Sequence, residues 1–179
     1  MEVLMGVQII REKTCCFTGH RHLAERDSLW IRRRIREEAA KLWREQGVDT
    51  FLAGGALGFD TMAAQEVLHL KEDLEPRLKL ILVLPFPGQE SRWTQKQQLL
   101  YRALLSQADE SFYTGDFFSR ESLLLRDRYL VEHSAHCLCY LDQRRRNGGT
   151  SYTVRYALAN GLNIVNLAPA PPDAQDPFL

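Results

Sequence analysis

Short apolar runs alternate along the chain with longer segments of helical periodicity. Residues 80–84, Leu-Ile-Leu-Val-Leu, are apolar without interruption, as in strands that are buried on both faces of a parallel sheet. The segments between such runs place apolar residues three and four positions apart, which is typical of amphipathic helices. This alternation predicts an α/β protein with a Rossmann-like, open and mostly parallel sheet that has helices on both faces.

The same pattern predicts six strands, five helices and a single domain. The expected strands cover residues 14–18, 50–53, 78–84, 111–113, 135–141 and 163–167. The first expected helix begins at Asp27 or Ser28, and the others cover residues 61–73, 90–107, 119–133 and 151–159. Residues 168–179 contain four of the seven prolines and no helical period. We therefore expect one domain over residues 1–167 and a Pro-rich, flexible tail over residues 168–179.

The charge composition argues against partners that are held by charge alone. The 179 residues include 23 Lys and Arg and 23 Asp and Glu, so the formal net charge is zero. Nucleic-acid binding is therefore not expected by default. No apolar run reaches the roughly 18 residues that span a bilayer, and the first residues do not form a signal-peptide pattern. We expect a cytoplasmic protein without a membrane partner.

The four cysteines are interpreted as reduced core residues. Cys15 and Cys16 are neighbours, Cys137 and Cys139 are two positions apart, and each pair lies inside an apolar run. This is not the spacing of zinc ligands, and the histidines show no metal-site spacing, so we expect no metal. A disulfide or redox use is the alternative, because two buried strands would bring the pairs together.

Glycines and polar residues gather where the expected strands end. Ligands of open parallel sheets bind beyond these ends, where glycine admits a close backbone approach and the next helix offers free N–H groups to an anion. We expect phosphate on the loops 54–58 and 148–150, and a tight turn without a ligand is the alternative for the first loop. The residues expected to bind the ligand are Gly19, His20, Arg21, Gly54, Gly55, Ala56, Gly58, Asp60, Pro85, Phe86, Gln89, Trp93, Arg126, Gly148, Gly149, Thr150 and Thr153.

Several of these side chains have two interpretations. Asp60 either caps the following helix or accepts hydrogen bonds from a ribose hydroxyl. Arg21 is expected to hold a phosphate or carboxylate, whereas His20 is either a general acid or base or a hydrogen-bonding partner of a loop. Trp93 either stacks on a base or packs in the core. Arg126 and the arginine two positions later cannot share one helical face, so at most one of them points into the crevice.

The strand-end motifs together resemble the YpsA-like family of the SLOG superfamily. The resemblance spans residues 14–167 and implies a Rossmann-like fold that binds a nucleotide or a nucleotide-derived ligand. It also implies a bacterial origin and a link to cell division in Gram-positive bacteria. The motifs that carry it are Cys16-Phe17-Thr18-Gly19-His20-Arg21, Gly54-Gly55-Ala56-Leu57-Gly58-Phe59-Asp60, Pro85-Phe86 with Gln89 and Trp93, Arg126-Asp127-Arg128-Tyr129-Leu130-Val131, and Gly148-Gly149-Thr150 with Thr153-Val154 and Ala157.

The superfamily also contains DprA/Smf DNA-processing proteins and LOG phosphoribohydrolases. LOG enzymes carry an arginine in the helix that precedes the strand before their glycine motif, and this chain has Arg126 at the comparable place. They also carry a glutamate in the helix after the glycine motif, and this chain has Arg155 near that position. A cation cannot act as the general base, so Asp142, Asp60 or Asp127 would have to substitute for that glutamate. If the protein is an enzyme, the catalytic candidates are Arg126, Asp142 and His20.

We therefore expect first a sensory or regulatory module that binds a nucleotide or nucleotide sugar and has no further cofactor. The second reading is a LOG-like phosphoribohydrolase that cleaves an N-glycosidic or phosphoribosyl bond. The third reading is a DprA-like DNA-processing or partner-binding module. The sequence leaves the identity of the ligand, a protein partner and the formation of homo-oligomers open.

Overall fold

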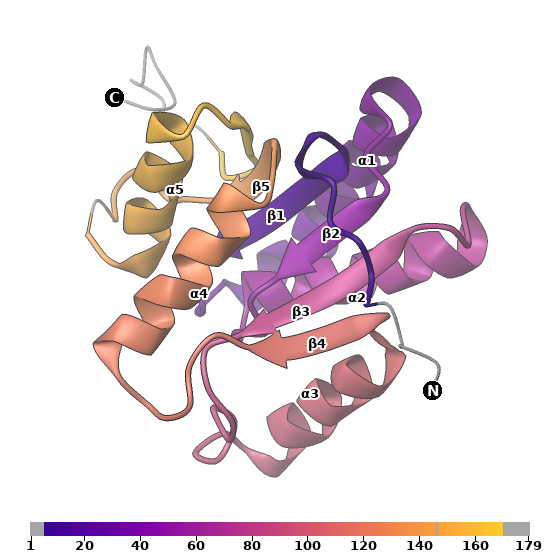
Figure 1. Cartoon of the computed structure of the whole chain (residues 1–179). Helices are drawn as coiled ribbons and strands as arrows, with labels where there is room; N and C mark the ends of the chain where they lie inside the picture. Colours follow the sequence, from indigo (N-terminus) through magenta and orange to yellow (C-terminus); the bar gives the residue numbers. More distant parts are fainter. Residues whose placement is uncertain (1–5, 146, 170–179) are drawn as a thin grey trace.

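Within residues 6–145 and 147–169, which the computed structural model describes, six parallel strands form one sheet (Figure 1). They are β1 (Thr14–Gly19), β2 (Thr50–Ala53), β3 (Lys79–Leu84), β4 (Glu110–Tyr113), β5 (His136–Tyr140) and β6 (Asn163–Asn166). Their order is β4-β3-β2-β1-β5-β6, and each neighbouring pair is parallel. The predicted Rossmann-like α/β fold is confirmed.

Helices cover both faces of this sheet. Successive residues of a strand point to opposite faces, so neighbouring residues of one strand pack against different helices. Phe17 of β1 packs in the same cluster as Ile31 and Ile35, whereas the preceding Cys16 packs with Leu130 and the helix that follows β5. The two core clusters therefore place three helices on one face of the sheet and two on the other. They are α1 (Ser28–Gln46), α2 (Phe59–Asp73) and α3 (Gln95–Gln107) on the first face, and α4 (Arg120–Glu132) and α5 (Gly149–Ala159) on the second.

Four helices begin at residues other than the predicted ones, and the smallest difference is at α4, which begins at Arg120 because Ser119 is its N-cap. The helix predicted from residue 90 begins at Gln95, because Thr94 and Gln97 form a capping box. The two other helices begin two residues early, directly after glycines with positive φ, Gly58 and Gly148. Asp60 consequently lies inside the first turn of α2, and the expectation that it caps this helix is wrong.

Gly58 brings the end of β1 against the start of α2. Its φ is 80°, and a Cβ there would lie 2.3 Å from the carbonyl oxygen of Arg21 and 2.5 Å from that of His20. The next residue, Phe59, donates its backbone N–H to the same His20 carbonyl at 3.1 Å. Only glycine fits between these backbones, and the contact sets Asp60 beside the carboxyl end of β1.

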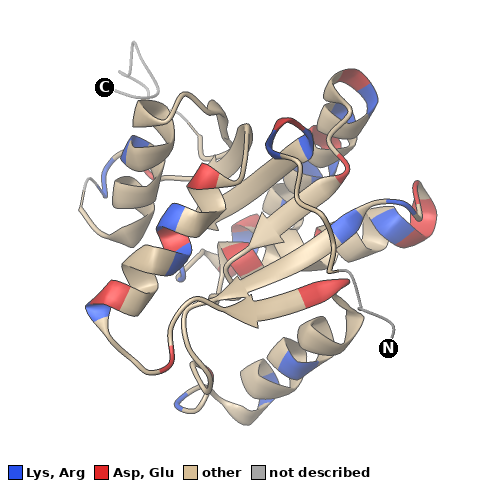
Figure 2. Cartoon of the chain, in the orientation of Figure 1, with Lys and Arg blue, Asp and Glu red and all other residues tan. Residues whose placement is uncertain are grey.

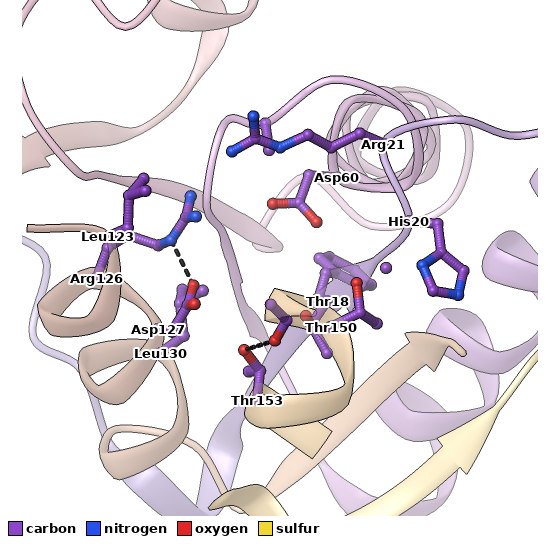
Figure 3. A pocket seen from close by; sticks show the side chains of 14 residues that line it. Thr18, His20, Arg21, Asp60, Leu123, Arg126, Asp127, Leu130, Thr150 and Thr153 are labelled. Atoms are coloured by element: carbon purple, nitrogen blue, oxygen red, sulfur yellow. Dashed lines mark hydrogen bonds and ion pairs between the residues drawn. The ribbon is translucent and has the colours of Figure 1, made fainter. Parts of the chain in front are cut away.

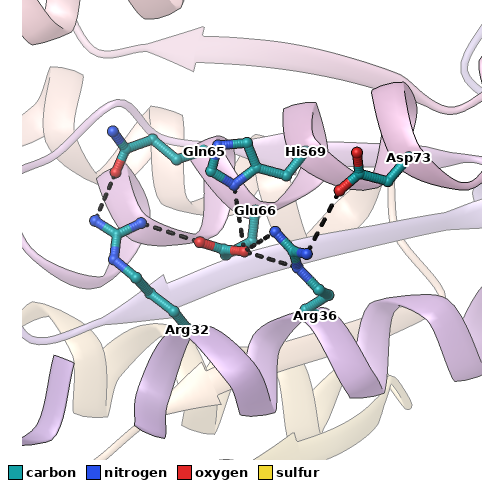
Figure 4. Close-up of polar contacts among 6 residues, drawn as sticks. All are labelled: Arg32, Arg36, Gln65, Glu66, His69 and Asp73. Carbon is teal, nitrogen blue, oxygen red and sulfur yellow. Dashed lines mark hydrogen bonds and ion pairs between the residues drawn. The ribbon is translucent and has the colours of Figure 1, made fainter. Parts of the chain in front are cut away.

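A buried carboxylate joins α1 to α2 (Figure 4). Glu66 of α2 is 4% exposed and lies between two arginines of α1. Arg32 donates to its Oε1 at 3.1 Å, and Arg36 donates to its Oε2 at 3.0 and 3.1 Å. His69 lies 3.5 Å from the same oxygen. We call these four residues the Glu66 clamp.

The cysteines are free thiols in the core. All four are buried, and Cys16 lies opposite Cys137 in the register of β1 and β5. Burial raises the pKa of the Cys139 thiol to about 12, so it stays protonated at neutral pH. This agrees with the expectation of reduced core residues.

Along α2 and α4, Lys and Arg positions lie close to Asp and Glu positions, in keeping with the zero net charge (Figure 2). No helix in the described part of the chain is long and apolar enough to cross a membrane. Residues 170–179 of the predicted tail, and residue 146, lie outside the described residues.

Candidate functional site

A cavity of about 350 Å³ lies at the carboxyl end of β1, where the chain has changed from one face of the sheet to the other (Figure 3). Ligands of open parallel sheets bind at such switch points. We call it the switch-point cavity. Residues from β1 and its exit, the start of α2, α4 and the start of α5 line it, namely Phe17, Thr18, Gly19, His20, Arg21, Ala56, Asp60, Leu123, Arg126, Asp127, Leu130, Gly149, Thr150 and Thr153.

Arg126 is held rigidly in the wall of this cavity. It is 6% exposed, and its Nη1 donates to the Gly54 carbonyl at 2.6 Å while its Nε donates to Asp127 Oδ1 at 2.6 Å. A Cβ at Gly54 would lie 2.4 Å from that Nη1, so glycine leaves the room for this contact. Arg128 lies outside the cavity and donates to the Tyr152 hydroxyl at 3.1 Å. As predicted, only one of the two arginines lines the crevice.

Asp60 places a carboxyl group in the cavity that is largely shielded from water. It is 6% exposed and has a hydrogen bond with the Ala56 backbone. Burial raises the pKa of this carboxyl to about 6; Arg126 and Arg21 oppose the rise, and the nearby Asp127 adds to it. Asp60 and Asp127 are therefore two acidic groups that share one small, partly desolvated space.

Two features give the opposite wall a positive potential. Arg21 extends over the cavity above Asp60, and its guanidinium makes no hydrogen bond or ion pair with a residue that the structure describes (Figure 3). The first turn of α5 places Gly149 and Thr150 in the lining, and its N-cap residue, Gly148, has no side chain that could cap the helix. Its first N–H groups and the positive end of its dipole therefore lie at the cavity.

His20 and Asp142, two of the catalytic candidates, follow β1 and β5, respectively, and are held by hydrogen bonds at these strand ends. The Nε2 of His20 accepts the backbone N–H of Asp142 at 3.0 Å, which requires a neutral ring. Burial and Arg145 lower the pKa of His20 against the influence of Asp142. The Asp142 carboxylate accepts three hydrogen bonds from Arg144, which lower its pKa, and it does not line the cavity. The structural role of His20 is thus the better supported of its two interpretations.

A second cavity of about 380 Å³ adjoins the first and shares Arg21 and Leu123 with it. We call it the aromatic cavity. Phe118, which is 72% exposed, meets Phe86 edge to face at 5.5 Å between ring centroids. Trp93 meets Tyr101 in the same way at 5.4 Å, so it both packs and lines the cavity. The remaining lining residues are Gly88, Gln89, Ser91 and Arg92.

The structure separates the predicted glycines into two groups. Gly54, Gly55 and Gly58 do not line either cavity, nor do Pro85 and Gly148. Gly55 has a φ of 67°, and a Cβ there would lie 2.5 Å from the Leu84 side chain. Within the loop 54–58 only Ala56 lines the switch-point cavity. Space for a ligand lies instead at Gly149, where a Cβ would meet no atom within 4 Å.

Sequence reasoning missed part of the α4 wall. Leu123 and Leu130 line the switch-point cavity with Arg126 and Asp127. Their spacing of three, four and seven residues is that of one helical face, so the pattern around Arg126 could have identified them. Phe17 and Thr18, at the end of β1, were also not among the expected ligand-binding residues.

The glutamate that LOG enzymes carry after the glycines has no counterpart on α5, as the sequence already indicated. Arg155 is exposed and lies outside the cavity, and the α5 side chain that lines it is Thr153, whose hydroxyl donates to the Gly149 carbonyl at 2.9 Å. The carboxylates that are present come from α2 and α4. Among the residues that the structure describes, no three His, Cys, Asp or Glu side chains are grouped to hold a metal ion.

Comparisons with known proteins agree with this architecture. A model of the YspA SLOG family matches residues 17–163. A UPF0398 protein from Bacillus pumilus is 29% identical over 146 residues, 75% of each chain, and one from Halalkalibacterium halodurans is 33% identical over 115 residues, 63% of this chain and 60% of the relative. DNA processing protein A from Helicobacter pylori, solved in a study of its single-stranded DNA binding mode, has a TM-score of 0.61 and 18% identity over 93% of this chain and 69% of its own.

Proposed function

The chain belongs to the YspA SLOG family, and from that premise we propose that it is a sensory or regulatory module that binds a nucleotide-type ligand at the carboxyl ends of its strands. The observation that carries the proposal is the pair of adjoining cavities, which meet at Arg21 and Leu123. The switch-point cavity contains the ionisable side chains of Arg21, Asp60, Arg126 and Asp127, and the aromatic cavity contains the rings of Phe86, Trp93 and Phe118 beside polar side chains. A nucleotide likewise has a charged phosphate end and a flat aromatic base with polar edges.

The phosphate end of the ligand fits the boundary between the cavities. Arg21 has no hydrogen-bond or ion-pair partner among the described residues and can hold a phosphate through two parallel hydrogen bonds. The first turn of α5 adds the backbone N–H groups of Gly149 and Thr150, which line the cavity, and a favourable helix dipole. Two arginines line the switch-point cavity. Arg126 is already bonded to Gly54 and Asp127 and positions the wall, so Arg21 is the one of the two that is left to meet an anion.

The base end fits the aromatic cavity. Phe86, Trp93 and Phe118 provide ring faces and edges on which a base can stack. Phe118 is 72% exposed, and a bound base would cover part of that apolar surface. The nucleoside then passes Leu123, which lies between the two cavities.

The same exposed aromatic side chains support a second candidate, binding of single-stranded DNA. Phe117 and Phe118 are each 72% exposed, and Arg92 lines the aromatic cavity. Bases stack on such aromatic platforms in single-strand binding proteins. The structural neighbour, DNA processing protein A, was solved in a study of single-stranded DNA binding. The zero net charge of this chain favours the small ligand.

A third candidate, cleavage of an N-glycosidic bond, has weaker support. Such a reaction uses a carboxylate as general acid, base or nucleophile, and α5 presents Thr153 at the cavity. Asp60 and Asp127 are the carboxylates present, and Asp127 is already bonded to Arg126.

Native mass spectrometry of the freshly purified protein tests the proposal. We expect a mass excess that disappears on denaturation and yields an intact nucleotide or nucleotide derivative. Release of a free base together with a sugar phosphate would transfer support to the hydrolase. A protein without any bound small molecule, whose thermal stability also does not change with a panel of nucleotides, would contradict the proposal.

A further inference from the structure

Gln89 carries a side-chain amide whose orientation is fixed by the fold. Its Nε2 donates to the Gly55 carbonyl at 3.3 Å and to the Tyr101 hydroxyl at 3.1 Å. A backbone carbonyl can only accept, so the amide atom that faces Gly55 has to be the nitrogen rather than the oxygen. The oxygen, Oε1, lies on the other arm of the amide and is therefore directed away from Gly55.

This oxygen is free to accept a hydrogen bond from a ligand. Within the described residues, no donor contacts Gln89 Oε1, and the buried side-chain atoms that lack a partner are Glu90 Oε2 and Ser134 Oγ. Gln89 Oε1 is therefore accessible rather than enclosed in the core. Because Gln89 lines the aromatic cavity, a donor on a ligand in this cavity can reach it.

One buried side chain positions both this acceptor and a stacking ring. Tyr101 of α3 is 3% exposed, accepts the hydrogen bond from Gln89 and meets Trp93 edge to face. Burial raises the pKa of Tyr101 to about 12, so its hydroxyl stays neutral at neutral pH. On the other side, the Gly55 carbonyl holds the same amide. The acceptor and the Trp93 ring are thus fixed relative to one another before a ligand binds, which lowers the entropic cost of binding.

The other polar side chains of the aromatic cavity supply mainly donors. Arg21, Arg92 and Trp93 can only donate hydrogen bonds, and the Ser91 hydroxyl rotates to donate or accept. Gln89 Oε1 is therefore the acceptor with a fixed place among the side chains that line this cavity. A base that stacks on the rings presents its polar edge to these groups. An amino group at that edge donates to Oε1, whereas a carbonyl sets a second acceptor against it and forms no hydrogen bond.

We propose that Gln89 selects the base of the ligand, because its Oε1 accepts a hydrogen bond from an exocyclic amino group. The cavity then prefers a base with an amino group to the base that has a carbonyl at the same position. This rests on the proposed function and specifies the base class of its ligand. It also gives the Gly55 carbonyl a task other than phosphate binding, which is to hold the amide that reads the base.

Calorimetric titrations with matched pairs of nucleotides test the selection. The probes are ADP with inosine diphosphate and CDP with UDP. The members of each pair share the ribose and the diphosphate, and they differ at the base edge, where an amino group replaces a carbonyl. We expect the amino-bearing member of at least one pair to bind roughly tenfold more tightly, as one hydrogen bond and a relieved contact between two acceptors provide.

The variant Gln89→Leu separates base selection from structural support. It also removes the contacts with Gly55 and Tyr101, so the readout is the ratio of the two affinities in a pair rather than either affinity alone. We expect this ratio to fall to about one. A residue with only a supporting role would weaken both members equally and leave the ratio unchanged. Gln98→Leu is the matched control, because Gln98 donates to the Trp93 carbonyl at 3.0 Å but lies outside both cavities, so its ratio should persist.

Four results would overturn the selection while the proposed nucleotide binding still stands. They are equal affinities within both pairs, tighter binding of the carbonyl-bearing members, an amino preference that survives Gln89→Leu, and an equal loss of the preference in Gln98→Leu. The last result would assign the preference to the order of the loop around Trp93 instead. If none of the four nucleotides binds at all, both proposals fail together.

Discussion

Asp60 shows most clearly how the position of one residue changes its chemistry. Burial raises the pKa of its carboxyl from 3.8 to about 6, so the folded protein takes up a proton at a higher pH than the unfolded chain does. Between about pH 4 and pH 6 the folded state therefore binds more protons. Asp60 consequently lowers the free energy of unfolding as the pH rises through this window, and the full effect is present above about pH 6.

The variant Asp60→Asn should remove this pH dependence. At pH 8 it should be more stable than the original chain by on the order of 3 kcal/mol, and the difference should shrink toward zero near pH 4. Urea denaturation at the two pH values measures both differences. A variant that is less stable at pH 8 would show that the ionised carboxylate is stabilised in the fold.

Gly58 tests how closely β1 and α2 must approach to form the cavity. In Gly58→Ala, the new Cβ would lie 2.3 to 2.5 Å from two backbone carbonyl oxygens at a positive φ. We expect a loss of roughly 3 kcal/mol or more in the free energy of unfolding. Gly149→Ala is the matched control, because its Cβ meets no atom within 4 Å, and it should change stability by less than about 1 kcal/mol. Equal losses in the two variants would refute the close-contact role of Gly58.

At the level of single residues, the sequence predicted where glycines cluster but not what each one does. Gly55 and Gly58 fit against Leu84 and against the backbone after β1, respectively, whereas Gly149 adjoins open space. This distinction depends on neighbours that are far away in the sequence: Leu84 is 29 positions from Gly55, and Arg21 and His20 are 37 and 38 positions from Gly58. The role of Arg126 was more accessible, because helical geometry alone separates it from Arg128.

At the level of elements, the Glu66 clamp joins the two helices that lie over the same face of the sheet. Glu66→Ala would leave Arg32 and Arg36 close together without their shared carboxylate. The arginine side chains are 31% and 42% exposed, so water offsets part of the loss, and we expect about 2 kcal/mol. Glu37→Ala, which removes exposed pairs on α1, should cost less than about 0.5 kcal/mol. A similar small effect for both variants, measured by urea denaturation, would contradict the clamp.

The elements themselves were predicted well where burial is complete. β2 has its predicted bounds, and β3 begins one residue later than predicted, because uninterrupted apolar runs mark strands covered on both faces. Helix starts were predicted less well. Thr94 and Gln97 are spaced as in a capping box, and this local pattern in the sequence marks the start of α3.

At the level of the whole molecule, the order of the strands creates the site. Sequence pattern predicted a parallel sheet, but it could not predict that β1 lies between β2 and β5. That order brings α4, α5 and the start of α2 together at the carboxyl ends of the strands. Arg126, Asp60 and Thr150 therefore line the same cavity. The family resemblance implied a nucleotide-type ligand, and the cavities bring ionisable side chains and aromatic rings close together.

The most direct test compares a whole nucleotide with its two halves. In calorimetric titrations, ADP and UDP should each be compared with the free nucleoside and with pyrophosphate. At least one nucleotide should bind more tightly than either of its halves. Arg21→Ala should weaken it about tenfold or more through the loss of a charged hydrogen bond, whereas the exposed Arg155→Ala should not. If neither nucleotide binds more tightly than its halves, or if Arg21→Ala has no effect, the two cavities do not hold one ligand.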